Sequence, residues 1–135
     1  MPKPAEIIAI SEAESRVMQA LWQHAPQPAE RIVATLQAQT GWHEKTVKTL
    51  LNRLLRKGAV SVQKDGRRYL YSPVLRREEW QQQESRSLLD RVFGGRLTPL
   101  LTHFSQHEQL SAKDIAELRK LIDAIDASPA DKKEH

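Results

Sequence analysis

The chain has 135 residues, of which 39% are hydrophobic and 28% are charged, and it contains no cysteine. This length and composition predict one folded domain, or one domain with an appendage, and exclude a disordered chain, a disulfide framework and a thiolate metal site. The sequence has no apolar run long enough to cross a bilayer and no signal segment at Met1–Ile10, so we expect a cytoplasmic protein.

Positive charge is concentrated in one part of the chain. The net charge is +4, yet residues 45–68 alone contain eight basic residues against a single acidic one, Asp65. A surface that binds a polyanion needs such a local excess of positive charge. The alternative explanation is a solvated helix face that is basic by chance. The predicted secondary structure of the charged segment distinguishes the two explanations.

The first two predicted helices precede the basic segment. A capping box spans Ser11 to Glu14, in which each of the two side chains accepts a hydrogen bond from the backbone amide of the other residue. Pro26 ends this helix, and a second short helix follows from Gln27-Pro28 to Gly41. The sequence leaves open whether a short early strand also exists here. Apolar residues at helical spacing are expected to form the core faces of both helices: Ala13, Val17, Met18, Leu21, Trp22, Ile32, Val33 and Leu36.

The basic segment predicts a third helix and a β-hairpin. The helix runs from about Glu44 to Lys57, with its apolar stripe on one side and polar or basic residues on the other, and Gly58 is suited to its C-terminus. The hairpin follows, with alternating apolar residues on both strands and a turn at Asp65-Gly66. Three helices and a hairpin in this order predict a winged helix-turn-helix, in which the third helix is the recognition helix and the hairpin is the wing.

Three further helices are predicted after Arg76. Gly94-Gly95 ends the first of them, and Ser111 caps the last. Their apolar residues have no evident partner in their own chain, so we expect residues 76–127 to form a helical dimerisation region and residues 128–135 to be a disordered tail. The alternative is a monomer in which these helices fold back onto the first domain. The expected dimer contacts are Leu88, Leu89, Val92, Phe93, Leu97, Leu100, Leu101, Phe104, Ile115, Leu118, Leu121, Ile122 and Ile125.

The predicted fold is therefore mainly α with a small β-hairpin wing, in which a winged-helix DNA-binding domain of residues 1–75 precedes the dimerisation region. A recognition helix meets the major groove with its N-terminal turns, and wings meet phosphates or the minor groove. Arg53 is expected to contact phosphates, whereas Arg56 and Lys57 near the helix end are expected to be solvated. The predicted DNA-binding residues are Lys45, Thr46, Lys48, Thr49, Asn52 and Arg53 on the helix and Lys64, Arg67 and Arg68 on the wing.

Three segments resemble the penicillinase-repressor family of transcriptional regulators. They are TVKTLLNRLLRKGAV followed by KDGRRYLYSPV, the opening ISEAESRVMQALW, and LSAKDIAELRKLI near the end. The resemblance covers about residues 8–125. It implies a dimeric winged-helix repressor that occupies an inverted-repeat operator in double-stranded DNA. In several members a membrane metalloprotease sensor triggers cleavage of the repressor near its fifth helix, at an Asn-Phe pair, and the matching position here is His103-Phe104. The cysteines of the copper-responsive branch are absent.

Other classes of function have less support in the sequence. We expect no enzyme, because the chain has no glycine-rich phosphate loop, no G-x-S-x-G and no H-E-x-x-H motif. We expect no cofactor and no metal site, and His103 and His107, four residues apart, are interpreted as surface polar groups. The alternative functions are a MarR-type regulator that responds to a small molecule and a winged-helix module that binds protein instead of DNA.

Overall fold

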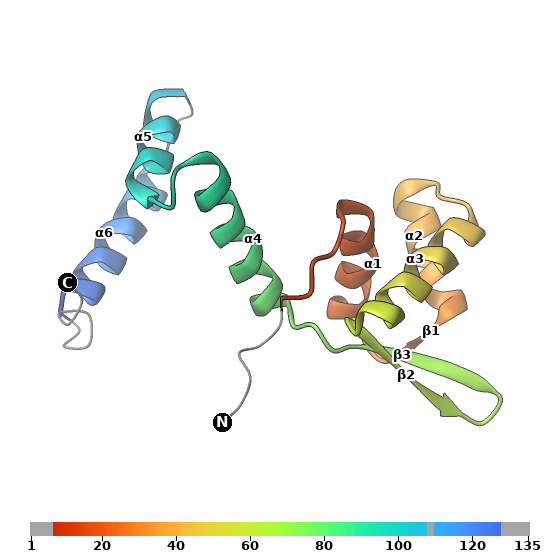
Figure 1. Ribbon diagram of the computed structural model, residues 1–135. Coiled ribbons are helices and arrows are strands. Elements are labelled where there is room, and N and C mark those ends of the chain that lie inside the picture. The colour runs from red at the N-terminus through yellow and green to blue at the C-terminus, as the bar shows by residue number, and fades with distance from the viewer. Residues whose placement is uncertain (1–6, 108–109, 128–135) are drawn as a thin grey trace. The chain divides into compact units, whose positions relative to one another are not determined.

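The computed structural model describes residues 7–107 and 110–127, which form two compact units that divide between Ser85 and Arg86. The first unit contains α1 (Glu12–Gln23), β1 (Gln27–Pro28), α2 (Ala29–Thr40), α3 (Glu44–Lys57), β2 (Val60–Asp65) and β3 (Arg68–Pro73) (Figure 1). Helix α4 (Arg77–Val92) crosses the division, and α5 (Leu97–His107) and α6 (Ala112–Ala127) lie in the second unit. The sequence-predicted tail, residues 128–135, lies outside the described residues.

Helices α1, α2 and α3 pack around one hydrophobic core. The predicted capping box of α1 is confirmed: the Ser11 hydroxyl accepts from the amide of Glu14 at 3.0 Å, and the Glu14 carboxylate accepts from the amide of Ser11 at 2.8 Å. The buried core residues come from all three helices and from the two ends of the wing: Val17, Met18, Leu21, Ile32, Val33, Leu36, Val47, Leu50, Leu51, Leu54, Ala59, Val60 and Leu75.

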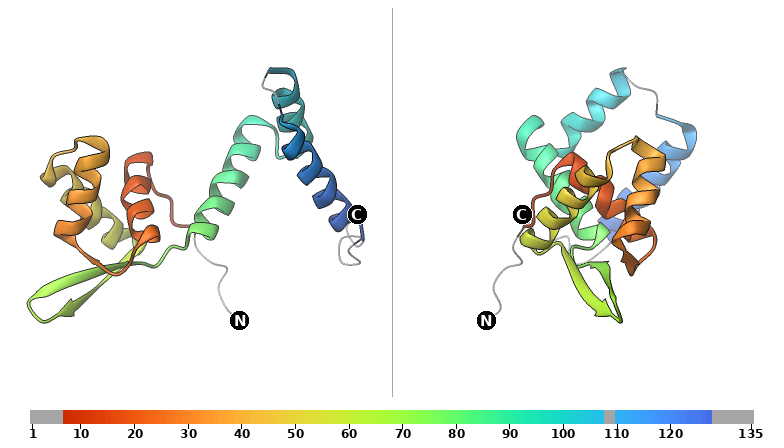
Figure 2. Two further views of the ribbon diagram at one scale, coloured as in Figure 1. Left: turned by 180° about the vertical axis from the view of Figure 1, so that it is seen from behind. Right: turned by 90° about the vertical axis from the view of Figure 1, so that its right-hand side faces the viewer.

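The three strands form one antiparallel sheet in the order β1-β3-β2. The early strand that the sequence left open exists, because Gln27 and Pro28 pair with Tyr71 and Leu70 of β3. Pro28 is also the N-cap of α2, so the helix predicted to start at Gln27-Pro28 begins at Ala29. Its missing amide is tolerated at this sheet edge. The wing projects from the helices in each view (Figure 1 and Figure 2).

Local signals correctly predict the end of α3 and the turn of the wing. Gly58 has φ +81°, its amide donates to Leu55 and the amide of Ala59 donates to Leu54, a Schellman arrangement. In the wing, Asp65 pairs with Arg68, so the connection has two residues. Gly66, the first of these two residues, has φ +65°. Arg67, the second, has negative φ, because every described residue with positive φ is a glycine. Positive φ at the first position alone is the pattern of a type II′ turn.

The beginning of α4 belongs to the first unit. Trp80 lies against Trp22 with ring centroids 5.3 Å apart, and the indole nitrogen of Trp22 donates to the carbonyl of Leu75 at 2.9 Å. The side chain of Gln83 donates to the carbonyl of Ile8 at 3.0 Å. The compact first unit therefore extends to Ser85, whereas the domains predicted from the sequence meet at residue 75.

The second unit exposes most of its apolar side chains. No residue of α5 or α6 is buried, and the Ser111 hydroxyl caps α6 as predicted by accepting from the amide of Asp114 at 3.0 Å. Of the predicted dimer contacts, Leu89, Phe93, Leu100, Leu101 and Leu118 are half-buried. The remaining ones are exposed: Leu88, Val92, Leu97, Phe104, Ile115, Leu121, Ile122 and Ile125.

Candidate nucleic-acid interface

Helix α3 has one buried face and one face open to solvent. Its apolar stripe lies in the core, and Val47 and Leu54 have no exposed surface. The six polar residues predicted to bind DNA all have exposed side chains: Lys45, Thr46, Lys48, Thr49, Asn52 and Arg53. The core thus fixes the helix in rotation, since turning α3 about its axis would expose its apolar stripe to water. The solvent face of this helix is consequently a preformed polar and basic surface.

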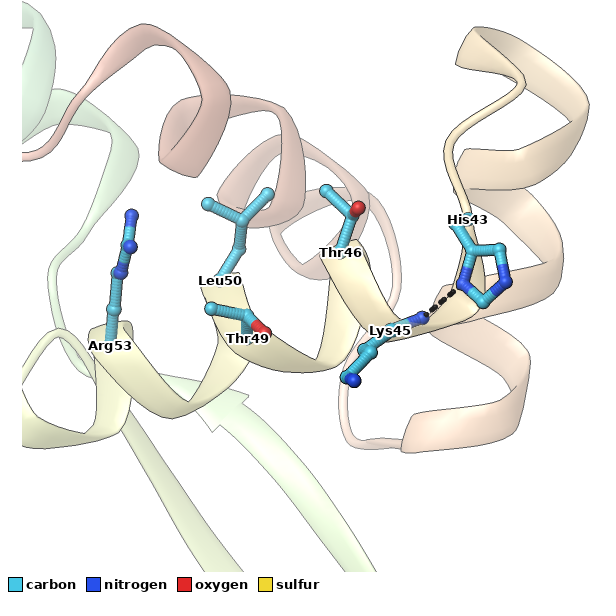
Figure 3. A pocket seen from close by; sticks show the side chains of 6 residues that line it. All are labelled: His43, Lys45, Thr46, Thr49, Leu50 and Arg53. Carbon is cyan, nitrogen blue, oxygen red and sulfur yellow. Dashed lines mark hydrogen bonds between the residues drawn. The ribbon is translucent and has the colours of Figure 1, made fainter.

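His43 begins α3, a role that the sequence did not suggest. Its Nδ1 accepts a hydrogen bond of 3.0 Å from the backbone amide of Lys45, so the ring is the N-cap of the helix (Figure 3). A neutral imidazole that accepts at Nδ1 carries its proton on Nε2. His43 therefore holds a hydrogen-bond donor beside the first turn of α3. Serine, threonine, aspartate and asparagine are the usual cap residues, which is why the sequence pattern did not identify it.

A shallow hollow runs along the same side of α3. It is lined by His43, Lys45, Thr46, Thr49, Leu50 and Arg53 (Figure 3). Leu50 is almost fully buried, and the residues around it are polar or cationic. Such a lining offers hydrogen-bond donors and positive charge, which suit the acceptors of base edges and phosphates. It also offers the methyl groups of two threonines, which suit the methyl group of a thymine.

Glu44 and Lys48 form an ion pair on the first turns of α3. Lys48 Nζ lies 2.8 Å from Glu44 Oε2, and the two side chains are 53% and 55% exposed. The hydrogen bond from Lys48 lowers the pKa of Glu44, and the same bond raises the pKa of Lys48. Lys48, predicted to read bases, therefore carries a carboxylate partner in the free protein.

The wing adds a second basic surface. Lys64, Arg67 and Arg68 are all exposed; Arg67 follows Gly66 in the turn and Arg68 is the first residue of β3. Tyr69 pairs with Lys64 across the strands and is 53% exposed. At the base of the wing Val60 is buried in the core and Tyr71 packs against it, whereas residues 61–69 are exposed and can lie against another surface.

Lys57 does not have the solvated role that the sequence predicted. Its ammonium group donates to the carboxylate of Glu14 at 2.5 Å and to the carbonyl of Ala9 at 3.0 Å. Burial alone would raise the pKa of Glu14, but the hydrogen bonds from Lys57 and Ser11 outweigh it and hold that pKa below its usual value. Lys57 thus connects the C-terminal end of α3 to the start of α1, while Arg56 is exposed as expected.

The second unit contains the other residues singled out from the sequence. The rings of His103 and His107 lie on α5 with centroids 4.6 Å apart, and His103 and Phe104 are both exposed. Across residues 7–107 and 110–127, no cluster of three or more histidine, cysteine, aspartate or glutamate residues is arranged to hold a metal ion. Within the same ranges, no helix has the length and apolar character needed to span a membrane.

Comparison with known proteins gives one family. Residues 10–124 match the family model described as penicillinase repressor. The chain is 32% identical over 118 residues to the penicillinase repressor of Bacillus licheniformis, a match that covers 87% of this chain and 92% of that protein. It is 31% identical over 113 residues to the methicillin resistance regulatory protein MecI of Staphylococcus aureus (strain N315), covering 84% of this chain and 92% of that protein.

Two solved structures extend the comparison to the fold. The solution structure of the DNA-binding domain of the repressor BlaI matches with a TM-score of 0.50 and 34% identity, and the match covers 55% of this chain and 90% of that chain. The solution structure of the monomeric form of BlaI from Bacillus licheniformis, in complex with the blaP half-operator, gives the same TM-score, identity and coverage.

Proposed function

Because this chain belongs to the penicillinase repressor family, we propose that it is a transcriptional repressor that binds an inverted-repeat operator as a dimer. The observation that carries the proposal is the exposed polar and basic face of α3, which the core holds beside a basic wing. The similarity of the chain to a repressor solved on its half-operator supports DNA as the partner. On this proposal the protein acts in the cytoplasm, where it prevents transcription by occupying a promoter.

In the proposed complex the N-terminal half of α3 enters the major groove. Lys45, Thr46, Lys48 and Thr49 then face base edges, where lysine donates to guanine and a threonine methyl meets a thymine methyl. Asn52 lies one turn further along and reaches bases or phosphates. Phosphate contacts come from the remaining cations, Arg53 on α3 and Lys64, Arg67 and Arg68 on the wing.

Selection from a pool of random duplex DNA, followed by sequencing and repeated at two salt concentrations, tests the proposal. We expect enrichment of one inverted repeat and an affinity that falls steeply as salt rises, because bound lysine and arginine residues release counterions from the DNA. Binding that is weak and indifferent to sequence at both salt concentrations would contradict the proposal and favour a winged-helix module that binds protein.

Substitutions on α3 and on the wing should have different effects. Lys48→Ala and Thr46→Ala are each expected to weaken binding to the selected duplex by about 1–2 kcal/mol, with little change on a scrambled duplex, because base contacts carry the sequence preference. Arg67→Ala is expected to weaken binding to both duplexes alike and to reduce the salt dependence by about one counterion. Binding isotherms on the two duplexes measure these effects. Equal losses on both duplexes for all three variants would refute base reading by Lys48 and Thr46.

We also propose that a membrane metalloprotease sensor releases the repressor from DNA by cutting the His103–Phe104 bond. Both side chains are exposed, which favours access, but both residues lie within α5, so the helix must open locally before a protease can bind the bond in an extended form. Mass spectrometry of the chain recovered from derepressed cells is expected to show a fragment that ends at His103. An intact chain in derepressed cells would exclude this route of induction.

A further inference from the structure

The ion pair between Glu44 and Lys48 is placed where a recognition helix meets DNA. Glu44 is the first residue of α3, and Lys48 lies one turn later on the same side of the helix. More than half of each side chain is exposed, so both are accessible to a ligand. Their polar atoms are 2.8 Å apart, which presents a donor and an acceptor side by side.

Glu44 has the first-turn position that the dipole of α3 favours for a carboxylate, but this position does not explain its pairing with Lys48 on a DNA-binding face. An exposed pair four residues apart on a helix contributes little to folding. A carboxylate at this position also repels phosphates, and it partly neutralises Lys48, one of the cations on the basic face. Glu44 therefore lowers the general attraction of α3 for DNA. It is compatible with DNA binding if its carboxylate accepts a hydrogen bond from a base.

The major-groove edge of a G·C base pair complements such an ion pair. Guanine presents two acceptors, O6 and N7, and cytosine presents the free hydrogen of its N4 amino group. Guanine O6 and cytosine N4 are joined by a Watson–Crick hydrogen bond and therefore lie about 2.9 Å apart. This separation agrees with the 2.8 Å between Lys48 Nζ and Glu44 Oε2. The lysine can donate to guanine while the carboxylate accepts from cytosine, and the ion pair itself stays intact.

An A·T pair fits less well. Its donor is the N6 amino group of adenine and its acceptor is thymine O4, so the carboxylate would have to lie on the purine side. There it would face adenine N7, which is also an acceptor, and two acceptors repel each other. The lysine would meet the single acceptor of thymine instead of the two acceptors of guanine. The charge pattern thus favours G·C over A·T and also fixes the orientation of the base pair.

We propose that Glu44 and Lys48 act together to read one G·C base pair in each half of the operator, with Lys48 on guanine and Glu44 on cytosine. This inference rests on the proposed function, because it assigns part of the sequence preference of the same DNA-binding face. On this proposal Glu44 determines specificity, although from its charge alone it would be expected only to repel the phosphates of DNA.

The test compares the base preferences of four full-length proteins by selection from random duplexes: the wild type, Glu44→Ala, Lys48→Ala and the control Glu84→Ala. Alanine is used because glutamine could still accept from cytosine or donate to guanine. Glu84 is an exposed carboxylate on α4, so its substitution matches the loss of charge without changing α3. For the wild type and the control, we expect one G·C pair of fixed orientation in each half-site, whose replacement by A·T weakens binding about tenfold. Both α3 variants are expected to reduce this factor at the same base pair to below about threefold and to keep the preference at the other positions.

The possible results separate the two proposals. If the wild type enriches an inverted repeat but Glu44→Ala keeps the same preference at every position, this inference is wrong and the proposed function stands. If Glu44→Ala binds all sequences more tightly by the same factor, the inference is also wrong, because Glu44 would then act only through its charge. If the wild type enriches no sequence, the proposed function fails and the inference fails with it.

Discussion

Glu14→Gln is expected to lower the free energy of unfolding of the first unit by about 2 kcal/mol at pH 7. Glu14 is 2% exposed, and its carboxylate accepts from both Lys57 and Ser11. Glutamine can still accept from the amide of Ser11, so the capping box survives. The loss of stability then measures the interaction of Glu14 with Lys57. The expected loss is moderate, because the ammonium group of Lys57 keeps part of its contact with water.

The same pair predicts how stability depends on pH. The pKa of Glu14 is held below its usual value of 4.5 in the folded chain, so between the two pKa values the unfolded chain binds more protons than the folded one. The stability that Glu14 contributes is therefore fully present above about pH 4.5 and is lost as the pH falls through the lower, folded-state pKa. The difference between the wild type and Glu14→Gln should consequently shrink in acid.

Urea denaturation followed by tryptophan fluorescence measures both effects, because all three tryptophans, Trp22, Trp42 and Trp80, lie in the first unit. Glu12→Gln is the matched control. Glu12 is an exposed carboxylate in the same first turn and has the same favourable position relative to the helix dipole. Equal destabilisation by the two substitutions would show that the Glu14–Lys57 pair adds nothing beyond this dipole effect.

Loss of the second unit is expected to reduce the affinity for an inverted repeat by about 100-fold. In the proposed dimer the second recognition helix binds intramolecularly once the first is engaged, so the two half-sites reinforce each other. A chain that ends at Ser85 keeps the contacts of Trp80 and Gln83 with the first unit and is expected to be a monomer that binds a single half-site. Sedimentation equilibrium and binding to whole and half operators measure the two effects.

A single substitution tests dimerisation in the full chain. Ile122→Glu places a charge among the exposed apolar residues of α6 and is expected to convert the dimer to a monomer, since Ile122 is 57% exposed and a second copy would have to bury the new charge. Ala116→Glu adds the same charge on another side of α6 and should leave the dimer intact. A full-length wild-type chain that sediments as a monomer would refute the proposed dimer.

Local chemistry explains why much of the fold could be predicted. The capping box at Ser11, the left-handed Gly58 after α3 and the Ser111 cap of α6 each depend on residues within a few positions of one another. The apolar stripe of α3 likewise follows from the period of an α-helix. These patterns predicted the order of the helices, the wing and the exposed basic face of α3 before any tertiary contact was known.

Contacts between distant residues could not be predicted in this way. Strand β1 has only two residues, too few for any periodic pattern, and it exists because β3 offers it hydrogen bonds. The side chain of Gln27, which is buried, donates to the carbonyls of Ala20 and His24 and so completes the end of α1. The cap formed by His43 was missed for a different reason, because histidine is not a usual cap residue.

The helices, the wing and the basic face follow from the amino-acid sequence, because caps, turns and apolar periods act over a few positions along the chain. Which of the charges stay available to a ligand depends on the folded structure. Lys48 and Lys57 are both lysines on the same helix, but the fold joins Lys57 to the buried Glu14 and leaves Lys48 exposed beside Glu44. The partner of Lys48 lies four residues away on the same helix, whereas the partner of Lys57 lies 43 residues away and is brought within hydrogen-bonding distance only by the packing of α1 against α3.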